Sequence, residues 1–215
     1  MSVKLWAKIL IFLFAGIFSF SAHAAFDEIK VRDFLNATGE KFIETLGLED
    51  VDRKYEILDE MFENSFDTDA MGRFVLGQSY RLLNEEQRLK YDELFKRYIK
   101  SLYKSYPLDF DTSEVQFKIV QITPKEKYVS GVVAVNLPEK YQTENIKSVR
   151  VEFKLKPKND NTYLISDVLI ADVSLLITLR SRFAQMLKDA DNEPEWFLQD
   201  FEDLTLSNER QINLE

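Results

Sequence analysis

The clearest structural signal in this chain is the segment SVRVEFKLK, residues 148–156. Charged residues in it alternate with apolar ones, which are Val149, Val151, Phe153 and Leu155. Strict alternation predicts a strand with one covered face and one wet face, which is typical of antiparallel sheets. The segment therefore predicts a sheet that needs a second layer over its apolar side.

Three further segments complete the predicted sheet. Residues 115–119 and 129–137 alternate in the same way, and residues 163–170 form a fourth strand that alternates less strictly. Residues 159–161 read Asn-Asp-Asn, which are turn residues suited to joining the last two strands. We expect these four strands to form one curved antiparallel sheet.

Helical periodicity precedes and follows the sheet, over 29–46, 55–62, 84–106, 174–186 and 194–204. A short helix over 67–77 has Asp67 as its N-cap and Gly77 as its stop. Asn84 and Gln87 predict a capping box for the long helix, and Ser174 caps the first closing helix. This order predicts an α+β domain whose helices cover one face of the sheet.

The first 24 residues have the three parts of a secretory signal. Lys4 and Lys8 precede an apolar run of about a dozen residues, short of the roughly 20 that span a bilayer, and Ala22-His23-Ala24 ends the segment. We therefore expect cleavage after residue 24, a single domain over 25–207, and a flexible C-terminal tail over 208–215. The mature chain is expected to be exported, as a soluble monomer without a membrane anchor.

His23 is the single histidine of the chain, and there is no cysteine. Without the leader, Ser-His-Asp, Cys-His and common zinc chemistry are excluded. Phosphate-loop, dinucleotide and nucleophile-elbow glycine patterns do not occur. The formal charge of −9, which becomes −11 without Lys4 and Lys8, argues against nucleic acid as a partner. We expect a binding protein that is not an enzyme and uses no metal or cofactor.

One enzymatic alternative stays open. A cone-shaped α+β domain with a curved sheet can place an Asp base and Tyr donors in an apolar pocket, as ketosteroid isomerase does. Asp167 on the fourth predicted strand, with Tyr103 or Tyr106, would supply this chemistry. The competing interpretation is that Asp167 pairs with a strand neighbour or faces water.

Two blocks of sequence resemble the MlaC family of periplasmic phospholipid-binding proteins, also called toluene-tolerance auxiliary components. The first is DTDAMGRFVLG at 67–77, followed by Tyr80-Arg81 and Glu86-Gln87-Arg88. The second is ISDVLI at 165–170, followed by Val-Ser-Leu at 173–175 and RSRF at 180–183. Two positions depart from the family pattern, because Asp172 stands where glycine is usual and Leu179 where an aromatic residue is common.

The resemblance implies an NTF2-like cone enclosing an apolar cavity, and a carrier that maintains the lipid asymmetry of the outer membrane. Phospholipid acyl chains would lie between the sheet and the helices. The implied partners are an outer-membrane lipoprotein–porin complex and the substrate-binding ring subunit of an inner-membrane ABC transporter. A binder of another apolar ligand, hopanoid-like or steroid-like, is the alternative carrier.

The apolar sheet face supplies most of the expected lipid-binding side chains. The full expected set is Phe74, Leu102, Tyr106, Phe117, Val133, Val135, Val151, Phe153, Ile165, Val168 and Leu176. Four arginines are expected to rim the cavity mouth or meet partners, namely Arg73, Arg81, Arg180 and Arg182. The basic outer side of the third strand, at residues 147–156, is a second candidate docking patch, although a solvated sheet face is the commoner explanation.

Overall fold

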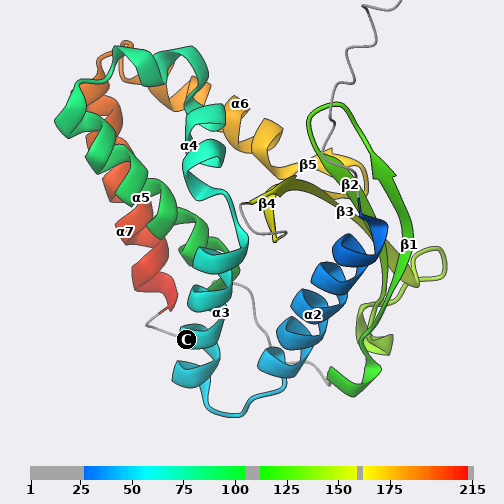
Figure 1. Ribbon diagram of the computed structural model, residues 1–215. Helices are drawn as coiled ribbons and strands as arrows, with labels where there is room; N and C mark the ends of the chain where they lie inside the picture. Colours follow the sequence, from blue (N-terminus) through cyan, green and yellow to red (C-terminus); the bar gives the residue numbers. More distant parts are fainter. Residues whose placement is uncertain (1–26, 105–111, 159–161, 213–215) are drawn as a thin grey trace, which may run out of the picture.

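The computed structural model describes residues 27–104, 112–158 and 162–212 (Figure 1). The predicted signal sequence and the predicted turn at 159–161 lie outside these residues. None of the helices in the described ranges is both long enough and apolar enough to cross a membrane.

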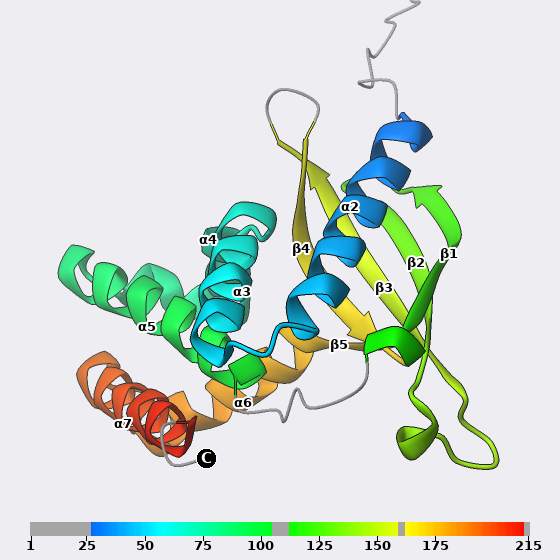
Figure 2. The same cartoon turned by 90° about the horizontal axis from the view of Figure 1, so that it is seen from below.

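Six α-helices and five strands make up the described part of the chain (Figures 1 and 2). The helices are α2 (Glu28–Leu46), α3 (Val51–Ser65), α4 (Thr68–Leu76), α5 (Glu85–Lys104), α6 (Leu175–Asp189) and α7 (Pro194–Ile212). The strands are β1 (Gln116–Pro124), β2 (Val129–Asn136), β3 (Ser148–Pro157), β4 (Tyr163–Ile170) and β5 (Val173–Ser174). Short 3-10 turns are η1 (Gly77–Leu82), η2 (Thr112–Glu114) and η3 (Glu139–Tyr141).

The predicted helix boundaries rest on local hydrogen bonds. The Asp67 carboxylate accepts from the backbone N–H of Ala70 and starts α4. Asn84 and Gln87 exchange side-chain and backbone hydrogen bonds, so the predicted capping box is confirmed at the start of α5. Gly77 ends α4 with a φ of +61°, a backbone conformation that glycine adopts without strain.

The strands form one antiparallel sheet in the order β1-β2-β3-β4-β5. The predicted count of four strands is one short, because the chain turns back after β4 within two residues. Ala171 and Asp172 both have positive φ, as a tight type I′ hairpin requires, and Val173 and Ser174 then pair with the end of β4. The two-residue pairing is too short to show as an alternating pattern.

The helices do not all cover the sheet. α2 crosses one face of the sheet, here called the inner face, whereas α3, α4 and α6 meet the sheet at β4 (Figure 2). Gly131 lies where Leu35 of α2 approaches the sheet, since a Cβ there would stand 2.6 Å from the Leu35 side chain. Close contact between α2 and β2 therefore depends on the missing side chain.

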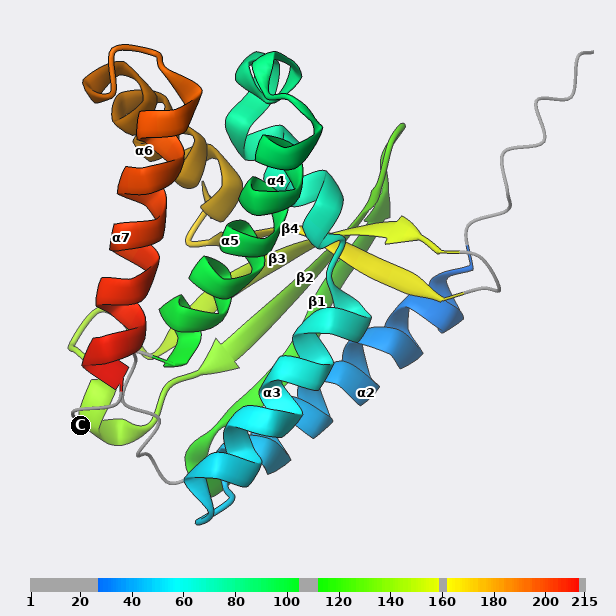
Figure 3. The same cartoon turned by 90° about the vertical axis from the view of Figure 1, so that its left-hand side faces the viewer.

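A second core lies among the helices, so the domain has a sheet core and a helical core. α5 and α7 run side by side in the same direction, joined by the ion pairs Lys90–Glu202 and Arg97–Glu209 (Figure 3). Fully buried aromatic rings fill the space between α5, α6 and α7, and they are Tyr91, Phe95, Tyr98, Phe183, Phe197 and Phe201.

The two cores meet at the link between α3 and α4. Phe66 packs against both cores and forms a parallel bridge with Ile165 of β4. The N–H of Asp67 donates to the Ile165 carbonyl at 2.9 Å. This contact fixes the helical part of the molecule against β4 of the sheet.

Helix α7 extends past residue 207, where the sequence analysis places the end of the domain. α7 continues to Ile212, and the Asn208 amide donates to the Ser101 hydroxyl of α5 at 3.2 Å. Residues 208–212 are therefore helical, and the contacts of Asn208 and Glu209 with α5 hold the helix beyond the apolar pattern that ends at Leu204.

Candidate functional site

The strand register gathers apolar side chains from four strands on the inner face. Phe117 pairs with Val135 across β1 and β2, and Val133 pairs with Val151 across β2 and β3. Residues directly opposite each other in a ladder share a face. The inner face accordingly comprises Phe117, Ile119, Ile122, Val129, Gly131, Val133, Val135, Val149, Val151, Phe153, Leu155, Tyr163, Ile165, Val168 and Ile170.

A bulge in β4 decides which of its residues join this face. Leu155 pairs with Ile165, but Lys154 already pairs with Asp167, so Ser166 is the extra residue. After the bulge the alternation is reversed, and Val168 pairs with Phe153 on the inner face. The bulge therefore explains the weak alternation of the fourth strand, and it turns Asp167 to the outer face.

Helix α2 buries part of the inner face and leaves the rest accessible. Leu155 and Ile165 are buried with Val31 and Leu35 of α2 in the sheet core. Further along the strands the apolar side chains are half-buried, namely Phe117, Val135, Val149, Val151, Phe153 and Val168. Ile170, at the end of β4, is 56% exposed. A strip of partly exposed apolar side chains thus lies beside α2.

The remaining predicted lipid-binding residues do not lie on the inner face. Leu176 is buried in the helical core, and Leu102 packs against that core. Phe74 on α4 is 43% exposed and lies beside Arg180. Their helical spacing is equally compatible with a helix–helix core, and this core forms. Tyr106 lies outside the described residues.

The four predicted arginines belong to the helical part of the molecule. Arg182 donates to the Tyr98 hydroxyl at 2.7 Å, and Arg180 lies over the Phe74 ring at 5.2 Å from its centroid. Arg73 and Arg81 are exposed on α4 and η1.

Two of the pockets in the described part of the chain are lined by residues outside the inner face. One, of about 490 Å³, is lined by Glu114, Pro138, Glu139 and Lys140. The other, of about 290 Å³, lies between α4, η1 and α6 and is lined by Val75, Leu76, Gln78, Ser79, Arg180, Phe183, Ala184, Leu187 and Asn192. Helix α2 covers part of the inner face, and the enclosed cavity that the resemblance implies stays a prediction.

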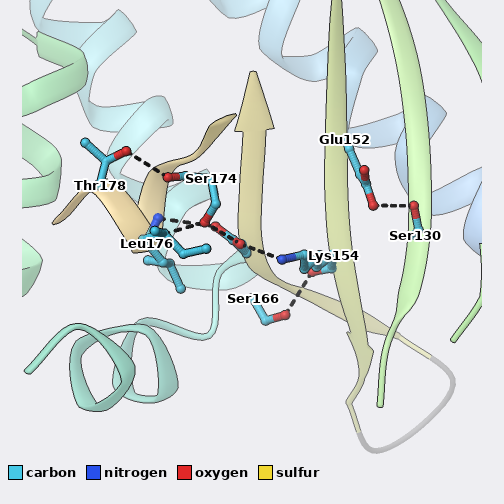
Figure 4. Close-up of polar contacts among 9 residues, drawn as sticks. Ser130, Glu152, Lys154, Ser166, Ser174, Leu176 and Thr178 are labelled. Carbon is cyan, nitrogen blue, oxygen red and sulfur yellow. Dashed lines mark hydrogen bonds and ion pairs between the residues drawn. The ribbon is translucent and has the colours of Figure 1, made fainter. Parts of the chain in front are cut away.

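Asp167 forms a network on the outer face that joins the sheet to α6 (Figure 4). Its Oδ2 accepts from Lys154 Nζ at 2.9 Å and from Ser174 Oγ at 2.8 Å, and its Oδ1 accepts from the Leu176 N–H at 3.3 Å. Ser174 in turn caps α6 by accepting from the N–H of Ile177. The pairing of Asp167 with a strand neighbour is thus observed.

The residues of the isomerase alternative lie in separate networks. Tyr103 donates its hydroxyl to Asp59 of α3 at 2.6 Å, and burial followed by this hydrogen bond raises the pKa of Tyr103 well above its usual range. Asp167 is turned away from the inner face, so it does not meet a ligand held there. Within the described ranges, no three His, Cys, Asp or Glu residues gather as a metal-binding group.

Sequence reasoning missed several inner-face residues. The predicted first strand ends at Ile119, so it does not include Ile122. Ile122 reaches the inner face because the register of β1 shifts at a bulge between Ile119 and Gln121. Phe34 of α2 packs on Tyr163 with ring centroids 6.0 Å apart. Phe34 stands next to Leu35 in the predicted first helix, and this position was the signal in the sequence that Phe34 could pack against the sheet.

Comparisons with known proteins agree with this geometry. The model of the MlaC family, described as MlaC protein, matches residues 41–199. The solved structure of a phospholipid-binding protein from Ralstonia solanacearum, in complex with a phospholipid, superposes with a TM-score of 0.68. The two chains are 14% identical, with 82% of this chain and 97% of the other covered, so the likeness shows a shared fold. A search of curated proteins finds no match. Because the family model spans most of the sequence, the chain belongs to the MlaC family.

Proposed function

We propose that this protein is a periplasmic carrier that binds phospholipid acyl chains against the inner face and moves the lipid between outer-membrane and inner-membrane complexes. The observation that carries the proposal is the half-buried apolar strip beside α2. The helical core of the same chain is filled by fully buried rings, so the open strip is not a general feature of its packing. Large exposed apolar patches on globular proteins generally mark ligand-binding or partner-binding sites.

The energetics of an apolar face suit a shuttle. Each buried methylene is worth about 0.8 kcal/mol relative to water, so two acyl chains with roughly 30 methylenes would gain more than about 20 kcal/mol. That gain is near the ceiling of non-covalent affinity, and release into water would be extremely slow. Transfer between a bilayer and the inner face instead moves the acyl chains from one apolar environment to another. The free-energy difference is therefore small, so the protein can both accept and release lipid.

The absence of catalytic chemistry on the inner face supports a carrier. The side chains on it are hydrocarbon apart from the hydroxyl of Tyr163, at the end buried by α2. An apolar lining holds a lipid without reacting with it. The basic outer side of β3 is a weaker candidate docking patch, because Lys154 and Lys156 already pair with Asp167 and Asp67.

The test is lipid retention in a pair of glutamate variants. Val151→Glu places a charge in the middle of the inner face. Val120→Glu is the matched control, since Val120 lies in β1 and is 60% exposed. Native mass spectrometry of protein purified from a Gram-negative periplasm should find a two-chain phospholipid on the wild type and on Val120→Glu, and none on Val151→Glu. Circular dichroism checks that each variant is folded.

Other results would contradict parts of the proposal. A wild-type protein that is empty, or that carries a sterol-like mass, would contradict phospholipid carriage, and the sterol-like mass would favour the hopanoid or steroid alternative. Retention of phospholipid by a folded Val151→Glu variant would show that the lipid binds elsewhere.

A further inference from the structure

Exposed apolar side chains form a stripe that leaves the inner face at the end of β4. Ile170 lies on the inner face and pairs directly with Val173 of β5, so their side chains are neighbours. Ile177 follows Val173 by four residues, in the first turn of α6. The exposed fractions of these three side chains are 56%, 62% and 58%, although each belongs to a regular element.

The stripe continues along α6 to a pocket on the helical part of the molecule. Arg180 lies three residues after Ile177 and therefore on the same side of the helix. Its guanidinium stacks on the exposed ring of Phe74 and also lines the pocket of about 290 Å³ between α4, η1 and α6. From Leu175 to Ala184 at the pocket wall, α6 rises by about 14 Å. The stripe and pocket together have the length of a short helix or strand of a partner.

The charge along this stripe selects the kind of partner. Arg180 takes part in none of the ion pairs formed among the described residues. The chain carries a net charge of −9, so an anionic membrane surface is repelled at long range. An acidic side chain on a partner protein can approach Arg180 locally, because a short-range pair next to apolar contacts is less screened by salt.

We propose that the stripe Ile170–Val173–Ile177–Phe74, with Arg180 and the adjoining pocket, docks an apolar segment of a partner protein that carries a carboxylate facing Arg180. An amphipathic segment laid in a groove between two helices is a recurring mode of recognition. Asp172 at the opposite end of the stripe repels acid, so the partner segment lies with its acidic end at Arg180.

The position of the stripe gives it a role in lipid exchange, a role that rests on the proposed function. The stripe begins at Ile170, which pairs with Val151 in the middle of the inner face. A partner seated on the stripe therefore borders the lipid-binding strip without a polar gap. Acyl chains can then leave the inner face along an apolar path that the partner shields from water.

Site-specific photo-crosslinking in the bacterium that produces the protein tests this inference. A benzophenone amino acid replaces Ile177 in the full chain, and Leu89 is the control position because it is a 68% exposed leucine on α5. We expect position 177 to crosslink to a protein segment that contains apolar residues and a nearby Asp or Glu, identified by mass spectrometry of the joined peptides. Arg180→Glu should lower the yield at position 177 by about ten-fold, and Arg180→Lys should largely retain it.

Four results would overturn the inference. They are no crosslink at position 177, a crosslink to a second copy of this chain, a crosslink to lipid alone, and a yield that Arg180→Glu leaves unchanged. Lipid loading separates this inference from the proposed function. Ile177→Glu protein should still carry phospholipid by native mass spectrometry while its delivery of that lipid to isolated inner membranes falls by about ten-fold. An empty wild type would contradict the proposed function even if position 177 crosslinks as expected.

Discussion

Replacement of Asp167 by asparagine should destabilise the protein without removing its lipid. The Asp167 side chain is 8% exposed and accepts from Lys154, Ser174 and the Leu176 N–H, so the change leaves the Lys154 ammonium with no counter-charge at this site. The side-chain oxygen of an asparagine can replace one of the two carboxylate oxygens of Asp167. Its NH₂ group would replace the other oxygen and would then face hydrogen-bond donors.

The magnitude follows from the burial of the pair. Removing one partner of a fully buried ion pair costs about 3–5 kcal/mol. Lys154 is 25% exposed and can recover some hydration, which lowers our expectation to about 2–3 kcal/mol. For a chain of this size, a shift of about 2–4 °C per kcal/mol corresponds to a melting temperature lower by roughly 4–12 °C.

Urea unfolding followed by circular dichroism measures this loss, with Glu152→Gln as the matched control. Glu152 lies on the same outer face and accepts from the Ser130 hydroxyl at 2.6 Å, a bond that a glutamine oxygen can also accept. We expect the control to lose less than about 1 kcal/mol. An Asp167→Asn loss no larger than that of Glu152→Gln would refute the argument that this network joins β4 to α6.

Lipid content and turnover complete the assay. The structural role predicts that folded Asp167→Asn protein retains phospholipid as the wild type does. Turnover of a ketosteroid by the wild type that disappears in the variant would instead support the isomerase alternative.

Three further predictions concern backbone strain and alkaline stability. Asp172→Gly should raise the free energy of unfolding by about 0.5–1 kcal/mol, because Asp172 has a φ of +66°; an unchanged or lower urea midpoint would contradict this. Gly77→Ala should lower the free energy of unfolding by about 1–3 kcal/mol in the same assay, because a φ of +61° with a ψ of −128° strains any residue that has a side chain. An unchanged urea midpoint would mean that the α4–η1 turn relaxes. Burial, then the hydrogen bond to Asp59, raises the pKa of Tyr103, so the unfolded state loses this proton first and stability falls as the pH rises above 10. Tyr103→Phe should make that fall shallower in urea titrations on either side of pH 10, and an identical slope would refute the assignment.

Much of this architecture could be predicted from periodicity and capping residues. The alternation in β3 predicted an antiparallel sheet with one apolar face, and the register of β2 with β3 places those apolar residues opposite one another. Asp67, Asn84 and Ser174 predicted the starts of three helices because their caps are local interactions.

Features that depend on tertiary contacts were not predictable in the same way. The bulge at Ser166 exchanges the faces of β4, and its cause lies in pairing with β3, which alternation within β4 does not reveal. A helical pattern also cannot say whether its apolar side meets a sheet or other helices, so Leu176 was assigned to the lipid site and lies in the helical core. The departure at Asp172 did mark an unusual backbone, which the positive φ confirms.

The helical core has a consequence for how the chain folds. Its aromatic rings come from α5, which precedes the sheet in sequence, and from α6 and α7, which follow it. The contact between Tyr91 and Phe201 therefore requires that the whole sheet has already been synthesised. The strands pair mainly with sequence neighbours, and such contacts form faster than contacts between distant segments. We therefore expect the sheet hairpins to assemble early, while the closure of α7 against α5 is the late step that makes the domain resistant to proteolysis.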